Sequence, residues 1–306
     1  GHWSRETMID RHRAFARMVP ERTACLDETD IFSWEALDRV TDTIAANLIT
    51  LDLERDSTAL VQTASSCREV LIRIAFKKAG IIGAFAPLQW RRKEMDYVTE
   101  RIAPSLLIAD ATTLDMSADI RRRVNLSNSG AAGWIDWDRL LDPGESEIPD
   151  DRPFAFDEVS LITVSSGTSG IAKLCEWPEA AQICMGRVIG ERMGFRDDDT
   201  VGVFAPMAGA AGLLVWTASA TTSCTFVFPS NYRAEQLLDL AERRQITIAT
   251  TVPVILARLA QESSRPRDLD GLRMLRVGTA ATDVDAARTF EAHTGCKVIT
   301  ASGAME

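Results

Sequence analysis

Short apolar runs alternate with segments of helical periodicity along most of the chain. The first predicted helix has one apolar face, formed by Leu37, Val40, Ile44 and Leu48. Ser33 is placed to cap this helix. The elements predicted after it in the first half are strand 58–63, helix 67–80, strand 83–88, helix 91–102 and strand 105–109. Residues 111–158 are more polar, and the motifs SNSG and DPGESEIPDD indicate loops there.

A second alternation starts at the apolar run VSLITV, residues 159–164. The elements predicted after it are helix 177–194, strand 200–206, helix 209–222, strand 224–229, helix 233–244, strand 246–251, helix 253–262, strand 273–278, helix 283–295 and strand 297–302. Continuous apolar strands that alternate with helices form parallel sheets covered on both faces. We therefore predict an α/β fold with two stacked, mostly parallel sheets flanked by helices. One α/β half is expected over 1–150 and the other over 151–306, with a seam within 130–158.

Composition and charge narrow the possible partners. The chain has 306 residues, 46% of them hydrophobic and 25% charged, which is typical of a folded protein. Its net charge of −10 argues against nucleic acid or an anionic membrane as a partner, because such surfaces require a basic patch. The short basic cluster Arg121, Arg122 and Arg123 is predicted to be a solvated helix face. No apolar run reaches the ~18 residues of a membrane helix.

The cysteine pattern disfavours a metal site and a disulfide framework. Six cysteines are scattered along the chain without a C-x-x-C pair or a nearby histidine cluster. The N-terminal residues also lack the layout of a signal peptide. Reduced thiols in a cytoplasmic protein are the expectation that fits best.

Parallel sheets bind ligands at the carboxyl ends of their strands, so the loops to search are 165–173, 206–212, 278–282 and 302–306. The first of these loops contains Ser165, Ser166, Gly167, Thr168, Ser169, Gly170 and Lys173. Its hydroxyl and N–H groups suit a polyanion such as a triphosphate, because glycine lets the backbone approach closely. A flexible connection is the alternative. Two residues separate Gly170 from Lys173, so the loop is not a Walker A motif, and no G-x-G-x-x-G follows a predicted strand.

This loop resembles a motif of the adenylate-forming superfamily, which includes acyl-CoA synthetases, aryl-acid ligases and luciferase. The family has Thr-Ser-Gly-Thr-Thr-Gly-x-Pro-Lys-Gly after a buried strand, and SSGTSGIAKL at 165–174 is similar. Ala172 and Leu174 replace the family's proline and final glycine. The resemblance covers essentially the whole chain, from GHWSRET at the start to the segment 272–306, which ends like the family's aromatic-Gly-x-Thr-Glu motif. The chain is identified as a member of this superfamily because it contains both motifs in the same order as the family.

The resemblance implies ATP and Mg²⁺ as cofactors, together with a thiol from CoA or from the phosphopantetheine of a carrier protein. It places the β- and γ-phosphates of ATP against the loop from Ser165 to Gly170 and against Lys173. It places adenine along the turn of Gly278, Thr279 and Ala280, where close backbone approach suits a planar base. A tight strand-to-helix turn capped by Asp283 is a second, compatible explanation of these residues.

The family's final motif corresponds to the cofactor-binding candidates Ser302, Gly303, Ala304 and Met305, and to Glu306. Glu306 is expected to hold Mg²⁺, a hard cation that prefers carboxylate oxygen. Ser302 stands where the family has an aromatic residue that packs on adenine. Met305 stands where the family has a threonine that contacts the α-phosphate, and a thioether cannot donate that hydrogen bond. These departures weaken the case for vigorous catalysis.

The segment FAPMAGAAGLLVW, 204–216, follows a predicted strand where the family lines its acid pocket. The predicted acid-binding residues are Met207, Gly209, Ala210, Ala211, Gly212 and Trp216. Many family members have His or Asn near the position of Gly209. The small residues here predict a roomy, apolar pocket for a bulky cyclic or aromatic acid. A helix start packed against the sheet is the alternative.

The resemblance implies an acid:CoA ligase, or acyl-CoA synthetase, that activates a carboxylic acid as an acyl adenylate and passes it to a thiol. The family's ribose-binding aspartate, hinge and small C-terminal domain with its lysine are expected to lie beyond residue 306. No catalytic residue is therefore assigned, and these residues alone are expected to be poorly active. A non-catalytic nucleotide- or acid-binding member of the same fold is the alternative. The expected partners are a small carboxylic acid and, as a second candidate, an acyl carrier protein; homodimerisation stays open.

Overall fold

The computed structural model describes residues 3–117, 119–144, 147–164 and 173–301, and within them the strands form two sheets of seven strands each. The order in the first sheet is β7 (Ile135–Asp136), β6 (Arg122–Asn125), β5 (Leu106–Ala109), β3 (Thr58–Gln62), β4 (Ile82–Ala86), β8 (Val159–Val164) and β9 (Leu174–Pro178). The order in the second sheet is β14 (Lys297–Ala301), β13 (Met274–Gly278), β12 (Ile248–Thr251), β10 (Thr200–Val203), β11 (Thr225–Val227), β1 (Thr23–Leu26) and β2 (Ile31–Ser33). Neighbouring strands are parallel except β8–β9 and β1–β2. The predicted fold class is confirmed.

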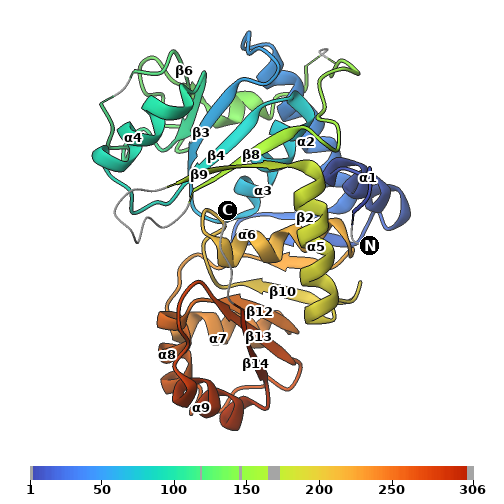
Figure 1. Ribbon diagram of the computed structural model, residues 1–306, viewed down its shortest axis with the longest axis vertical. Helices are drawn as coiled ribbons and strands as arrows, with labels where there is room; N and C mark the ends of the chain where they lie inside the picture. The colour runs from blue at the N-terminus through green and yellow to red at the C-terminus, as the bar shows by residue number, and fades with distance from the viewer. Residues whose placement is uncertain (1–2, 118, 145–146, 165–172, 302–306) are drawn as a thin grey trace.

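Helices fill the layer between the sheets and cover both outer faces (Figure 1). The middle layer holds α1 (Met8–Met18), α2 (Trp34–Ile49), α3 (Cys67–Ala79), α5 (Glu179–Met193) and α6 (Ala210–Thr217). The outer face of the first sheet is covered by α4 (Arg92–Ile102), and that of the second by α7 (Ala234–Arg243), α8 (Pro253–Glu262) and α9 (Val284–Thr294). Short 3₁₀ helices occupy Trp137–Leu140 and Ala218–Ala220. Because both faces of each sheet are covered, most of the strands are apolar along their whole length.

Local capping chemistry sets several helix ends as the sequence predicts. The Ser33 side chain accepts a hydrogen bond from the backbone N–H of Ala36, at the start of α2. Helix α3 ends at Gly80, whose φ of 67° lies in the left-handed region. Asp283 caps α9 by accepting from the N–H groups of Asp285 and Ala286.

Each sheet contains one pair of strands from the other half of the chain, and the sequence did not predict this. The pair β8–β9 extends the first sheet, where Leu161 pairs with Gly83, although the alternation pattern groups 159–164 with the later strands. The pair β1–β2 extends the second sheet, where Cys25 pairs with Phe226. The expected boundary between 150 and 151 therefore does not coincide with the boundary between the sheets. Pairing across more than a hundred residues has no local signal in the sequence.

The prediction of a helix at the basic cluster is wrong. Arg122 and Arg123 lie in β6. Arg122 pairs with Asp52 at 2.8 Å, and Arg123 pairs with Asp119 at 3.2 Å. These ion pairs balance the charged residues of a strand near the edge of the first sheet. The strand lacks the continuous apolar run by which the other strands were predicted. The short elements α1, β1, β2, β6, β7 and β9 also went unpredicted.

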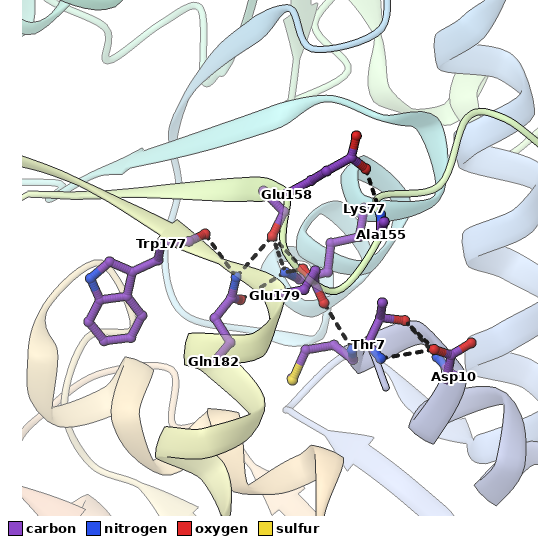
Figure 2. Close-up of polar contacts among 10 residues, drawn as sticks. Thr7, Asp10, Lys77, Ala155, Glu158, Trp177, Glu179 and Gln182 are labelled. Carbon is purple, nitrogen blue, oxygen red and sulfur yellow. Dashed lines mark hydrogen bonds and ion pairs between the residues drawn. The ribbon is translucent and has the colours of Figure 1, made fainter. Parts of the chain in front are cut away.

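Helix α3 lies at the centre of the molecule, and four of its charged residues, Glu69, Arg73, Lys77 and Lys78, are buried and form ion pairs. Lys78 contacts Asp38 at 2.6 Å and Asp42 at 2.7 Å. Lys77 forms an ion pair with Glu179 of α5, and its Nζ also donates to Ser160 Oγ at 2.9 Å (Figure 2). This network joins α3 to β8 and α5.

The same Glu179 carboxylate also anchors the N-terminal helix. Its Oε2 accepts a hydrogen bond of 2.9 Å from the backbone N–H of Met8 at the start of α1. Figure 2 shows Thr7 and Asp10 beside it, forming the capping box of that helix. One buried carboxylate therefore links α1, α3 and α5.

All six cysteines are free thiols. Within the described ranges, no helix combines the length and the apolar character needed to cross a bilayer.

Candidate functional site

Strands β10, β12 and β13 run in parallel next to one another, so the segments that follow them leave the same edge of the second sheet. Alternate residues of β13 face opposite sides. Leu275 and Val277 belong to the core under α7, α8 and α9. Arg276 faces the middle layer, where its Nη1 donates to Thr250 Oγ1 at 3.4 Å. Thr250 Oγ1 in turn donates to the carbonyl oxygen of Ala211 in α6 at 3.2 Å.

The turn after β13 brings its backbone close to the neighbouring strand. A Cβ atom at Gly278 would lie 3.2 Å from the carbonyl oxygen of Ala301. Thr279 has a φ of 80°, a left-handed conformation that a β-branched residue rarely adopts. Thr279 and Ala280 are exposed. They line a hollow of about 690 Å³ together with Ala281, Thr282, Val284, Ala287, Arg288, Glu291, Val298, Thr300 and Ala301.

A larger hollow, of about 800 Å³, lies at the ends of β1 and β11. Its charged lining residues are Asp27, Glu28, Asp239, Glu242, Arg243 and Arg244. Four carboxylates against two guanidinium groups make this a poor site for a polyanion, so we do not place the candidate site there.

The loop that follows β10 is held in place by α3 and by the turn just before it. The backbone N–H of Met207 donates to Ser65 Oγ at 2.7 Å, and its carbonyl oxygen accepts from Arg73 Nη2 at 3.0 Å. Arg73 is itself fixed by Glu69 Oε1, at 2.9 Å from Nε and 2.6 Å from Nη2. Its guanidinium carbon lies 3.6 Å from the centre of the Phe85 ring. Residues of the first half therefore set the position of a loop in the second sheet.

Burial controls the ionisation of this pair. It raises the pKa of Glu69 and lowers the pKa of Arg73, while the contact between the two charges opposes both shifts. Each side chain supplies the charge opposite to that of the other, which offsets part of the cost of burial and keeps Arg73 beside the carbonyl oxygen of Met207.

The predicted acid-binding residues occupy the start of α6 and its packed face. Gly209 is the N-cap of α6, and Ala210 begins the helix; both are half-buried. Met207 and Ala211 are buried. A Cβ atom at Gly212 would lie 2.5 Å from the carbonyl oxygen of Ala205, so this glycine allows α6 to pack on the preceding loop. These residues do form a helix start packed against the sheet, and their contact with an acid stays a prediction.

Trp216 lies deeper than the pocket prediction supposes. It is 2% exposed and packs in the core of the middle layer. Its ring centre is 6.3 Å from that of His12 and 5.7 Å from the guanidinium carbon of Arg73. This packing accounts for Trp216 without a ligand.

Several candidate residues lie outside the described residues. They are Ser165, Ser166, Gly167, Thr168, Ser169, Gly170, Ser302, Gly303, Ala304, Met305 and Glu306. Lys173 is described, is exposed and directly precedes β9. The phosphate and Mg²⁺ contacts of these residues stay predictions. Across 3–117, 119–144, 147–164 and 173–301, no three His, Cys, Asp or Glu side chains are grouped to hold a metal ion.

Arg276, which is 4% exposed, was not predicted as a site residue from the sequence. Its Nε is buried and has no hydrogen-bond partner among the described residues, and burial lowers the pKa of its guanidinium. A charged residue inside the apolar strand MLRVG was the available signal, because such a residue requires a partner when it is buried.

Known proteins are similar to this chain along its whole length. Residues 12–306 match a family described as "AMP-binding enzyme". Enterobactin synthase component E of Escherichia coli (strain K12) is 23% identical over 340 residues, which cover 100% of this chain and 59% of that protein. 2,3-Dihydroxybenzoate-AMP ligase of Bacillus subtilis (strain 168) is 26% identical over 322 residues, which cover 100% of this chain and 58% of that protein.

A solved structure also matches in its fold. The apo structure of Mycobacterium smegmatis MbtA superposes with a TM-score of 0.89 at 21% identity, covering 100% of this chain and 58% of that one. The chain thus spans less than two thirds of the length of these relatives. The resemblance of the sequence to the adenylate-forming superfamily is confirmed by the match over almost the whole chain, which therefore belongs to the AMP-binding enzyme family.

Proposed function

We propose that this chain supplies the ATP and acid sites of an ATP-dependent, AMP-forming acid–thiol ligase. A substrate carboxylate oxygen attacks the α-phosphorus of ATP, the bond to the leaving pyrophosphate breaks, and an acyl adenylate forms. The thiol of CoA or of a carrier protein then displaces AMP and takes the acyl group. The carboxylate is its own nucleophile, so catalysis rests on positioning and on neutralisation of charge.

One observation carries this proposal. The segments predicted to hold nucleotide and acid leave the same edge of the second sheet, and they are linked by hydrogen bonds. Arg276 lies two residues before Gly278, where the turn predicted to hold the nucleotide begins. It donates to Thr250, which donates to Ala211 near the start of α6. Two ligands bound by these segments would lie next to each other, as acyl transfer to ATP requires.

The residues of the turn fit a nucleotide base. The hollow beside it is lined by small side chains, including Thr279, Ala280 and Ala301, which leave room for a planar ring. Bound ATP would bring the phosphate that reacts, and Mg²⁺ would accompany its phosphates. The assignment of Glu306 to that ion and of Ser165–Gly170 with Lys173 to the phosphates is part of the proposal.

The relatives support activation of an aryl or other bulky acid. 2,3-Dihydroxybenzoate-AMP ligase and enterobactin synthase component E match this chain over its full length. An acid-binding role for Gly209 and Ala210 at the half-buried start of α6 is proposed on that basis. A carrier protein is proposed as thiol partner beside CoA, because several relatives are synthase components. A cytoplasmic location is proposed because the thiols are unpaired.

Trapping with hydroxylamine tests the proposed reaction. The intact protein is incubated with ATP, Mg²⁺, hydroxylamine and a panel of acids that includes benzoate, cyclohexanecarboxylate, acetate and propionate. We expect ATP-dependent hydroxamate with the ring acids. Preference for acetate or propionate would contradict the bulky-acid assignment. Binding of ATP and acid without any hydroxamate would favour the alternative, a non-catalytic binding protein of the same fold.

A further inference from the structure

Arg276 differs from the other deeply buried cations in the described part of the chain. Arg73 contacts Glu69 at 2.6 Å, Lys77 pairs with Glu179, and Lys78 contacts Asp38 at 2.6 Å. Arg276 is just as buried, but no Asp or Glu within the described ranges lies within ion-pair distance of it. An isolated buried charge is costly, so a site that keeps one requires an anion to balance it.

The donors of Arg276 are also largely unused. A guanidinium group has five N–H donors. The described contacts account for one, the long hydrogen bond of 3.4 Å from Nη1 to Thr250 Oγ1. Nε is buried and unsatisfied. The group therefore keeps the paired N–H donors that bind a carboxylate in the two-pronged manner typical of arginine.

The position of the guanidinium points to the acid rather than to the phosphates. Arg276 lies on the face of β13 that is turned to α6, and it is linked through Thr250 to Ala211. A Cβ atom at Gly278 would lie 3.3 Å from Nη1 and 3.4 Å from Nη2, so the missing side chain there lets the guanidinium pack against the start of the turn. The exposed part of the nucleotide turn, Thr279 and Ala280, lies further out. The buried cation thus lies on the α6 side of β13, next to the segment that is predicted to bind the acid.

We propose that Arg276 is a specificity-determining residue that binds a second carboxylate carried by the substrate, so that the preferred substrate is a dicarboxylic acid. This inference rests on the proposed function, because it treats the bound acid as the substrate of the ligase. The binding of the acid can be measured without catalysis. The reacting carboxylate faces ATP, while the second one pairs with the Arg276 guanidinium. Benzoate and its dicarboxylic analogues phthalate, isophthalate and terephthalate are matched probes, because they share the ring and differ in the second anion.

Two variants of the same strand region separate ligand binding from folding. Arg276→Met removes the charge and keeps an apolar side chain of similar length. Arg273→Met, the control, makes the same replacement three residues earlier, where the arginine contacts Asp199 at 2.6 Å. Because Arg276 has no described carboxylate partner, we expect Arg276→Met to keep or raise the melting temperature without ligand. Arg273→Met leaves Asp199 unpaired and is expected to lower it.

Calorimetric titration of each protein with the four acids and with ATP gives the decisive comparison. We expect the unmodified chain to bind at least one dicarboxylate about 10- to 100-fold more tightly than benzoate, as a charge-assisted hydrogen bond predicts. Arg276→Met should lose that preference while its affinity for ATP and benzoate stays the same, and Arg276→Lys should restore part of it. Arg273→Met should keep the preference.

Three results would overturn the inference. The first is a dicarboxylate affinity of the unmodified chain no greater than its benzoate affinity. The second is loss of ATP binding in Arg276→Met, which would assign the balancing anion to a phosphate. The third is a large drop in the melting temperature of unliganded Arg276→Met, which would show a structural partner. If the dicarboxylate binds through Arg276 but the intact protein forms no hydroxamate from it, the proposed ligase function fails while this inference stands.

Discussion

Burial decides the charge state of His12 in the middle layer. The ring is 3% exposed, its Nε2 lies 3.1 Å from Ser219 Oγ, and its centre is 5.4 Å from that of Trp34. Burial, with the nearby charges of Lys78, Lys77 and Arg11, lowers the pKa of His12 from 6.5 to about 3. His12 is therefore a neutral packing residue, although a histidine in a sequence is often taken first as a catalytic candidate.

This pKa makes the stability of the protein dependent on pH. Between pH 6.5 and about 3, the unfolded chain binds a proton at His12 that the folded chain does not. The free energy of unfolding should therefore fall as the pH falls through this window, by about 1.4 kcal/mol per pH unit. From pH 7 to pH 5 the unmodified protein should lose about 2 kcal/mol more than His12→Gln, measured by urea denaturation. Equal losses would mean that His12 becomes protonated in the folded state.

At the scale of elements, periodicity and capping predicted most helices and strands within a few residues. Helix α8 begins at Pro253 and ends at Glu262, as its pattern indicates. The strand β9 went unpredicted because LCEWP mixes polar and apolar residues, and the sequence places the start of a helix at 177 instead. An antiparallel strand at the edge of a sheet has no continuous apolar run, so it resembles a loop in the sequence.

Packing between elements depends on glycine at one helix crossing. A Cβ atom at Gly186 of α5 would lie 2.2 Å from the carbonyl oxygen of Thr217 at the end of α6. Gly186→Ala should therefore separate the two helices and lower the free energy of unfolding by about 2 kcal/mol or more. The matched control is Gly190→Ala, one turn further along α5, where the nearest atom is the Thr221 hydroxyl at 3.0 Å.

Chemical denaturation of the two variants checks this prediction. The Thr221 side chain can rotate, and alanine favours a helix over glycine by about 1 kcal/mol, so Gly190→Ala should be nearly neutral or stabilising. Similar destabilisation by both substitutions would show that helix propensity, rather than the close contact at Thr217, governs this crossing.

At the scale of the whole molecule, a few buried ion pairs join segments that are far apart in the sequence. The Lys77–Glu179 pair is the central one, since it connects α3 with α5 and, through Met8, with α1 (Figure 2). Burial lowers the pKa of Lys77, and the charge of Glu179 counteracts this shift.

Removing one partner should be much more harmful than removing both. Glu179→Gln leaves the Lys77 charge buried without a partner and should lower the free energy of unfolding by about 3 kcal/mol or more. The double variant Lys77→Met with Glu179→Gln should recover part of this loss. Asp115→Asn, which breaks the exposed pair with Arg92 at 3.1 Å, serves as control and should cost about 0.5 kcal/mol or less. A double variant that loses the sum of both single losses would mean that the pair contributes no coupling.

The sequence by itself determined the fold class, most of the elements and the family, because these depend on patterns within a few residues. Apolar spacing, caps such as Ser33 and Asp283, and the motif at 165–174 are local signals of this kind. It also predicted that loops after parallel strands share one edge of a sheet, as the loops after β10 and β13 do. Only the tertiary structure decided the sheet to which β8 belongs and the burial of Trp216 in the core. The tertiary structure alone revealed that Arg276 is a buried cation without a carboxylate partner among the described residues. Burial and charge pairing depend on contacts between distant segments, which the sequence does not show.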